Sequence, residues 1–159
     1  LLASGKKALL DADALNHLAN TPCRLSNVAL TPHPGEAGRL LQQPTTVVNA
    51  NRLLAANNIS TQYGASVLLK GAGTVIHTDE GVFINSTGNP GMASGGMGDV
   101  LSGIVGGLMA QGLSPAAALI AGAWCHGSSA DIAAGIVGEP GLTASDVIDH
   151  LTIPLKALQ

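Results

Sequence analysis

Short apolar stretches alternate with segments of helical periodicity through the first half of the chain. The stretches predict buried strands at 7–11, 28–31, 66–70 and 74–78, followed by a hairpin turn at 79–81 and a strand at 82–85. The segments between them predict a helix at 13–19, a short helix ending at Leu41, and a long helix with a polar outer face that begins at Thr45 or Thr46 and ends at about Tyr63. This alternation is typical of an α/β fold.

Helical periodicity dominates the second half. An apolar face recurs from Val100 to Met109, and Gln111 and Gly112 are predicted to end this helix. Three glycines within it would weaken an isolated helix, so we interpret them as points of close packing against a neighbouring element; they are Gly103, Gly106 and Gly107.

A longer apolar helix follows, with Ser114 and Pro115 as its N-cap and first residue and an end near residue 134. His126 and Asp131 lie within this helix and are interpreted as packing residues, since no pattern places them near a site. A loop is predicted at 135–141. Thr143 and Asp146 then match the capping box of a last short helix, which Pro154 is expected to interrupt.

The stretch at 89–103, NPGMASGGMGDVLSG, carries the strongest chemical signal. A helix N-terminus presents unpaired N–H groups, and glycines before it let more amides approach an anion; Gly95, Gly96, Met97 and Gly98 are therefore candidates for a phosphate-binding hole. A carboxylate beside such a site would repel phosphate, so we interpret Asp99 as a base or a metal ligand. The alternative is an ordinary glycine turn in which Asp99 stabilises the helix end.

Further candidates follow the ends of predicted strands, where open α/β sheets bind ligands. Asp11 and Asp13 follow the first strand, with helix capping the favoured role for Asp13. His33 is held between two prolines, and either a ligand contact or a bond to local backbone fits it equally well. Lys70 and the two glycines after it again suggest close backbone approach to an anion, although a lysine at a sheet edge also snorkels to solvent.

Composition narrows the class of protein. The chain has 159 residues, of which 46% are hydrophobic, 11% charged and 2% aromatic, which indicates one compact domain. A net charge of −3 gives no electrostatic footprint for nucleic acid or an anionic membrane. Cys23 and Cys125 form no paired motif, so a reduced, cytoplasmic protein is expected. No apolar run is long enough to span a bilayer, and the leucine at position 1 suggests a fragment.

Four motifs in this order together resemble one family: DADALN (11–16), TPHPGE (31–36), KGAGT (70–74) and NPGMASGGMGDVLSG (89–103). They are similar to the C-terminal half of the ADP- or ATP-dependent NAD(P)H-hydrate dehydratase domain, a member of the ribokinase-like superfamily. The resemblance covers nearly the whole chain, so residues 1–159 are expected to be the C-terminal portion of one such domain. It implies a three-layer α/β/α sheet that here lacks its N-terminal βα units.

The resemblance also implies an activity. Hydrated NADH or NADPH would be dehydrated at the expense of ADP or ATP, with Mg²⁺, a repair reaction on a nicotinamide nucleotide. His33 and Asp99 would contact the hydrate, with Asp99 at the reacting hydroxyl. The nucleotide would be held by Lys70, Gly71, Ala72, Gly73, Thr74 and Gly98. No residue is assigned to a metal, and a homo-oligomer and a fused epimerase domain are expected partners.

Two other functions compete with this one. A vitamin-precursor kinase of the same superfamily would use the same loop and acid for any acceptor hydroxyl. A nucleotide-binding module without catalysis would need no base at Asp99. Accumulation of a phosphorylated substrate would favour the kinase, and full turnover without the Asp99 carboxylate would remove that residue as the base.

Overall fold

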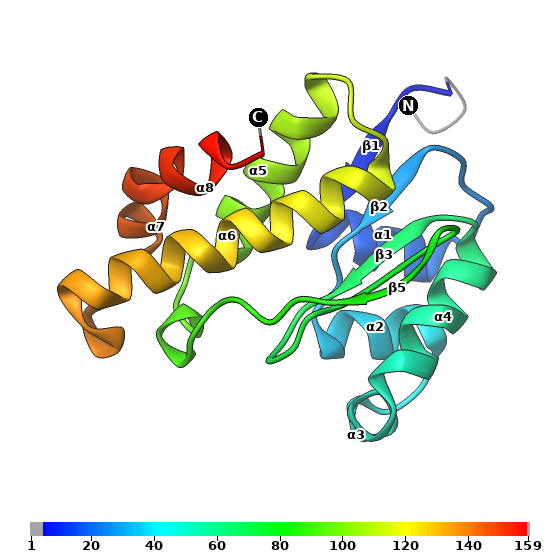
Figure 1. Cartoon of the computed structure of the whole chain (residues 1–159). Coiled ribbons are helices and arrows are strands. Elements are labelled where there is room, and N and C mark those ends of the chain that lie inside the picture. Colours follow the sequence, from blue (N-terminus) through cyan, green and yellow to red (C-terminus); the bar gives the residue numbers. More distant parts are fainter. Residues whose placement is uncertain (1–4, 159) are drawn as a thin grey trace.

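The computed structural model describes residues 5–158 and shows one sheet with helices on both faces (Figure 1). The strands are β1 (Ala8–Leu10), β2 (Val28–Leu30), β3 (Ser66–Leu69), β4 (Val75–Thr78) and β5 (Gly81–Ile84), and they lie side by side in sequence order. The first three run parallel, with Leu10 opposite Leu30, whereas β4 and β5 form an antiparallel hairpin at one edge. This confirms the predicted α/β architecture with a hairpin at its side.

One face of the sheet is covered by the helices of the first half, which are α1 (Asp13–Asn20), α2 (Pro34–Leu41), α3 (Thr45–Ala50) and α4 (Arg52–Tyr63). Leu30, Val67 and Leu69 point to this side and pack against Ile59 and Tyr63 of α4. The Tyr63 hydroxyl donates to the carbonyl of Leu40 at 2.9 Å, so the buried phenol has a polar partner. A core of aliphatic side chains therefore fixes these helices to the sheet.

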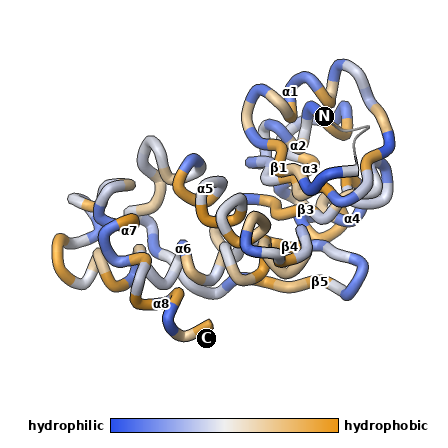
Figure 2. The backbone as a smooth tube through the Cα atoms, turned by 90° about the horizontal axis from the view of Figure 1, so that it is seen from above, coloured by the Kyte–Doolittle hydropathy of each residue, from blue (hydrophilic) through white to orange (hydrophobic). Residues whose placement is uncertain are grey.

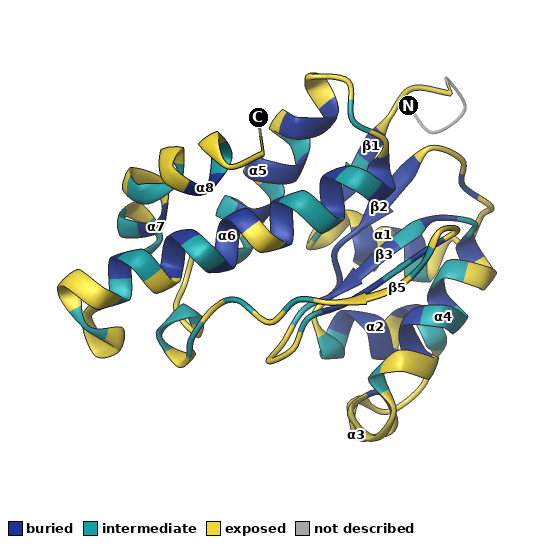
Figure 3. Cartoon of the chain, viewed as in Figure 1, coloured by how far each residue is buried: buried dark blue, intermediate teal, exposed yellow. Residues whose placement is uncertain are grey.

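The opposite face is covered by the helices of the second half, which are α5 (Met97–Ala110), α6 (Pro115–Val137), α7 (Ala144–His150) and α8 (Thr152–Lys156), with 3₁₀ turns at Pro90–Met92 and Glu139–Gly141. Ala29, Leu68 and Ile76 point to this side and pack with Val105 of α5 and Leu119 of α6. Because alternate strand residues point to opposite faces, both faces of β2 and β3 are buried (Figure 3). Viewed from above, the first-half helices gather on one side and α6 to α8 on the other (Figure 2).

The long helix predicted from Thr45 to Tyr63 is wrong in one respect, because the chain breaks it at Asn51. Asn51 has φ −148° and ψ 82°, outside helical values, and its side chain accepts from the Leu54 N–H at 3.0 Å. It is thus the N-cap of α4. Neither threonine caps α3, whose N-cap is Pro44 without a side-chain bond.

The interpretation of the α5 glycines is also wrong. An added Cβ at Gly103, Gly106 or Gly107 would meet no heavy atom within 4 Å. The close approach between α5 and α6 comes instead from Gly122 of α6, where a Cβ would lie 2.7 Å from Val105 Cγ2. The side chain of Val105 on α5 packs against α6, so the glycine that makes room for it is Gly122 on α6 and none of the three on α5.

Several predicted ends shift. The N-cap of α1 is Ala12, at φ 47°. Asp13 is the first helical residue and makes no capping bond, so the capping role predicted for it is wrong.

The helix α6 continues to Val137 and so includes the start of the predicted loop, and the second 3₁₀ turn lies at the end of that loop. The break near the C-terminus falls at Leu151, and Pro154 lies inside α8, where the first turn needs no N–H donor. Ser114 is confirmed as the N-cap of α6 with Pro115 as its first residue, and Thr143 and Asp146 form the predicted capping box of α7.

Across residues 5–158, no helix is long and apolar enough to cross a membrane. Cys23 is exposed and Cys125 is buried, and both are free thiols in this structure.

Candidate active site

Two bends of the main chain meet at the carboxyl ends of the parallel strands. The first bend follows β3, with positive φ at Gly71 and Gly73. The second precedes α5, with Gly96 at φ 85° as N-cap. A Cβ added to Gly98 would lie 3.5 Å from Lys70 Nζ and 4.0 Å from Asp11 Oδ2. The structure therefore brings together the predicted bends at 70–74 and 95–98.

Asp11 links the strand ends to α5. Its Oδ1 accepts from Lys70 Nζ at 2.8 Å and its Oδ2 accepts from Ser102 Oγ at 2.7 Å. Burial by itself raises the pKa of Asp11, but the hydrogen bonds from Lys70 and Ser102 outweigh it, and the net pKa lies below the ordinary value of 3.8. Lys70 Nζ is also 3.8 Å from Glu36 Oε2, so its ammonium faces two carboxylates.

His33 is the N-cap of α2. Its Nδ1 accepts from the N–H groups of Gly35 at 3.0 Å and Glu36 at 3.4 Å, while Glu36 Oε2 accepts from the His33 N–H at 2.7 Å. The backbone-bonding alternative is therefore confirmed for Nδ1, which must lack a proton to accept. The other nitrogen, Nε2, lies 3.5 Å from Glu36 Oε1, and the side chain is half exposed. His33 thus presents an Nε2–H group at the strand ends, in a fixed ring orientation.

Asp99 lies in the first turn of α5 and is exposed. It is not the helix cap, and no described residue donates a hydrogen bond to its carboxylate, so a capping bond is not borne out. As an acid in the first turn it does have the charge that stabilises a helix N-terminus, which was the other part of that alternative. Because the turn begins at Met97, the first N–H groups of α5 have no partner within the helix. A carboxylate free to accept a proton thus stands beside unpaired amides, which favours anion binding and base chemistry.

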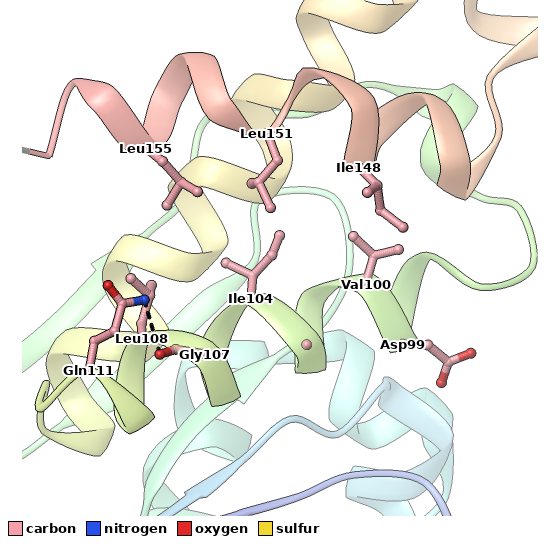
Figure 4. A pocket seen from close by; sticks show the side chains of 10 residues that line it. Asp99, Val100, Ile104, Gly107, Leu108, Gln111, Ile148, Leu151 and Leu155 are labelled. Carbon is pink, nitrogen blue, oxygen red and sulfur yellow. Dashed lines mark hydrogen bonds between the residues drawn. The ribbon is translucent and has the colours of Figure 1, made fainter.

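A groove runs from Asp99 along α5. It has a volume of about 450 Å³ and separates α5 from α7 and α8. Figure 4 shows the side chains on its two walls facing one another, with Asp99 at one end and turned away from them; these apolar residues are Val100, Ile104, Leu108, Ile148, Leu151 and Leu155. The acid is therefore accessible and does not lie among apolar side chains.

Comparison with known proteins identifies the family. A model described as NAD(P)H-hydrate dehydratase matches residues 1–152. The chain belongs to the NAD(P)H-hydrate dehydratase family. A bifunctional NAD(P)H-hydrate repair enzyme from Coxiella burnetii is 48% identical over 146 residues, which is 91% of this chain and 30% of that protein.

Solved structures agree with this membership. An ADP/ATP-dependent NAD(P)H-hydrate dehydratase from Bacillus subtilis, co-crystallised with ATP and Mg²⁺, superposes with a TM-score of 0.89 at 31% identity, over 100% of this chain and 57% of that one. A ribokinase-like superfamily protein from Enterococcus faecalis superposes with a TM-score of 0.77 at 29% identity, over 93% of this chain and 52% of that one. The ribokinase-like fold is therefore confirmed, and the chain spans between 30% and 57% of the length of these relatives.

Sequence reasoning missed three residues that lie at or next to the two bends. Ser102 follows Asp99 by three positions and so lies on a neighbouring face of α5, a spacing that could have revealed it. Glu36 stands inside the TPHPGE motif but was read only as part of a turn. Arg52 donates to the carbonyls of Ala72 and Gly73 in the bend at 70–74, and it gave no signal because the helix break that places it was not predicted.

The interpretation of Asp131 as a packing residue is wrong. Its Oδ2 accepts from the Gly88 N–H and its Oδ1 from Asn89 Nδ2, both at 2.9 Å. The linker from β5 to the glycine bend is therefore fixed to α6, which also approaches it at Gly127, where a Cβ would lie 2.7 Å from the carbonyl carbon of Thr87. Asp131 is thus a residue that places the linker before the site. His126, by contrast, is buried with Nε2 unpartnered, which agrees with its interpretation as a packing residue.

Proposed function

We propose that this chain is the C-terminal portion of a dehydratase domain that restores hydrated NADH and NADPH at the expense of ADP or ATP. The proposal is supported by membership of the NAD(P)H-hydrate dehydratase family and by the nucleotide bound to the Bacillus subtilis relative. The full-length protein would also carry an epimerase domain, in keeping with the bifunctional relative. A cytoplasmic location and a homo-oligomeric state stay predictions.

One observation carries the proposal, which is the junction of the two bends. Lys70 Nζ, the space above Gly98 and the free amides at the start of α5 converge beside an exposed carboxylate. Amides and an ammonium bind phosphate, whereas a carboxylate repels it. A nucleotide whose phosphates lie between the bends would therefore have its terminal group next to Asp99, with Lys70, Gly71, Ala72, Gly73, Thr74 and Gly98 around it and Gly95, Gly96 and Met97 at its reacting end.

The chemistry begins with transfer of a phosphoryl group. The ring hydroxyl of the hydrate attacks the terminal phosphorus, and Asp99 accepts its proton. A new phosphorus–oxygen bond forms as the bond to the leaving nucleotide breaks, giving AMP from ADP or ADP from ATP. The amides at the start of α5 hold the negative charge that gathers on the transferred group. His33 contacts the hydrate through Nε2–H and so orients the hydroxyl.

Elimination then completes the reaction. Phosphate leaves the ring carbon with the electrons of the carbon–oxygen bond, and the lone pair of the ring nitrogen forms a double bond to that carbon. Loss of a proton from the neighbouring ring carbon yields the dihydronicotinamide. Phosphate is a far better leaving group than hydroxide, which is why the nucleotide is consumed.

Magnesium fits this site as an ion carried by the nucleotide. Mg²⁺ is usually held by substrate phosphates, waters and one or two carboxylates, so it needs no cage of protein ligands. Within residues 5–158 there is no cluster of three or more His, Cys, Asp or Glu side chains suited to a metal, while Asp99 is an exposed carboxylate beside the expected phosphates. When bound, the ion would neutralise charge on the phosphates.

The test is a product assay on the full-length protein with hydrated NADH, ADP or ATP, and Mg²⁺. Dihydronicotinamide absorbance should return with equimolar inorganic phosphate. Asp99→Asn should lower kcat by about 10²- to 10⁴-fold, because a positioned base contributes that much, and should leave nucleotide affinity nearly unchanged. Asp79→Asn, in the exposed turn between β4 and β5, is the matched control and should retain full activity.

Three outcomes would contradict the proposal. Accumulation of a stable phosphorylated product would make the protein a small-molecule kinase. Full turnover by Asp99→Asn would remove Asp99 as the base, and nucleotide binding without any turnover in the wild type would indicate a binding module.

A further inference from the structure

Arg52 caps the outer side of the bend at 70–74. It is the first residue of α4, and its guanidinium donates to two backbone carbonyls of that bend and to one at the end of β3. Nη1 lies 2.5 Å from the Ala72 oxygen and 3.1 Å from the Gly73 oxygen, and Nη2 lies 2.9 Å from the Leu69 oxygen. One side chain thus binds the carbonyls on both sides of the turn.

These bonds decide which way the amides of the bend face. In a trans peptide the C=O and the following N–H point in opposite directions. Since the carbonyls of Ala72 and Gly73 point to Arg52, the N–H groups of Gly73 and Thr74 point away from it. No described residue accepts from either N–H, so both are available to an anion on the far side of the bend.

The guanidinium fits the bend closely and has no acid of its own. A Cβ on Gly71 would lie 2.9 Å from Nη2, so the glycine leaves the space that the guanidinium fills. Among the described residues no carboxylate forms an ion pair with Arg52. Its positive charge is therefore neutralised only by carbonyl dipoles, and part of its field reaches the bend itself.

We propose that Arg52 is a positioning residue for nucleotide binding, which holds the 70–74 bend with its free amides toward the nucleotide phosphates. This proposal rests on the assignment of that bend to the nucleotide. It gives a role to a side chain that lies behind the bend and touches neither nucleotide nor hydrate.

The experiment compares Arg52→Ala and Arg52→Lys with the wild type in the full-length protein. Loss of three hydrogen bonds should raise KM for ADP by about tenfold or more in Arg52→Ala, with kcat and KM for the hydrate within about twofold of wild type. Arg52→Lys keeps the charge but not the planar fork, so it should show most of the same rise. Guanidinium chloride at non-denaturing concentration should lower KM for ADP in Arg52→Ala and leave the wild type unaffected.

Arg24→Ala is the matched control. Arg24 Nη1 also donates to a backbone carbonyl, that of Thr61, at 2.7 Å, but it lies at the other end of α4. This variant should retain the wild-type KM for ADP, with or without guanidinium.

Hydrogen exchange and calorimetry separate this proposal from the proposed function. Amides of 71–74 should exchange faster in Arg52→Ala, and the affinity for ADP measured by calorimetry should fall, even if the wild type proves to have no dehydratase activity. Unchanged ADP affinity in the folded variant would overturn the role of Arg52, as would full recovery by Arg52→Lys, which would show that charge alone acts. If Arg52→Ala does not fold, the Arg52→Lys comparison decides.

Discussion

Lys70 Nζ lies 2.8 Å from Asp11 Oδ1, although 59 positions separate the two residues in the chain. The pair joins the ends of β3 and β1 across the end of β2, and it holds the ammonium against the space above Gly98. The lysine is therefore oriented before any nucleotide arrives. A ligand phosphate meets a charge whose position is already set, which limits the entropy lost on binding.

Asp11→Asn should weaken the fold. It leaves the largely buried Lys70 without its nearest carboxylate, and the free energy of unfolding should fall by about 1–2 kcal/mol at neutral pH. Because the pKa of Asp11 is lowered in the folded state, its contribution is complete above 3.8 and is lost as the pH falls through the folded-state pKa. Urea unfolding should show the gap between wild type and variant closing under acidic conditions. A gap that widens toward low pH would contradict this.

Gly98→Ala should lower the affinity for ADP without lowering the stability of the fold. Its Cβ would make only ordinary contacts at 3.5 Å and 4.0 Å, and alanine favours a helix over glycine by up to about 1 kcal/mol, so the thermal midpoint should hold or rise. The same methyl group occupies the space between the bends, and calorimetry should show ADP affinity reduced by about tenfold or more. Gly106→Ala on the same helix, where a Cβ meets nothing within 4 Å, should give the stability change without the loss of affinity.

Asp131→Ala should release the linker before the site. The Gly88 N–H and the Asn89 amide lose their acceptors, and unfolding should become easier by about 1–2 kcal/mol. Hydrogen exchange at Gly88 should accelerate more than exchange in the core strands. Asp131→Asn keeps one acceptor oxygen and should lie between the two. Equal exchange at Gly88 in all three proteins would show that the hydrogen bonds from Gly88 and Asn89 to Asp131 do not stabilise the linker.

His126 should make the fold sensitive to moderate acid. Burial lowers its pKa from 6.5 to about 4, so the unfolded chain binds a proton below pH 6.5 while the folded chain does not. Stability should therefore decrease as the pH falls from 6.5 toward 4, by up to about 3 kcal/mol. His126→Met removes the unpartnered Nε2 and should flatten this part of the profile while it keeps stability near pH 7. An unchanged slope in the variant would assign the acid sensitivity to other groups.

The strands and the glycine bends could be predicted because their signals are local. A buried strand is a short apolar run, and a bend such as 70–74 needs glycine at positive φ whatever surrounds it. The position of Asp99 beside amides follows from the helix that starts at Met97. These features depend on neighbours within a few residues, which a sequence shows directly.

The features of the fold and the site that could not be predicted depend on contacts between segments far apart in the sequence. Asp131 reaches Gly88 across 43 positions and Ser102 reaches Asp11 across 91, and no periodicity encodes either pair. The break at Asn51 was missed because no glycine or proline marks it, although the threonine, valine and asparagine residues before it are weak helix formers. The glycines of α5 were misread for a related reason, since a glycine in a helix shows only that a side chain is absent and not which neighbour needs the space.

The close contact between Gly122 of α6 and Val105 of α5 also bears on the position of the acid. A methyl group of Val105 lies 2.7 Å from the position that a Cβ at residue 122 would take, so α5 and α6 pack closely at this point. Asp99 lies on the same helix as Val105, so the position of the acid depends in part on two residues that carry no charge. An alanine at position 122 would require Val105 or the adjoining turn of α5 to move.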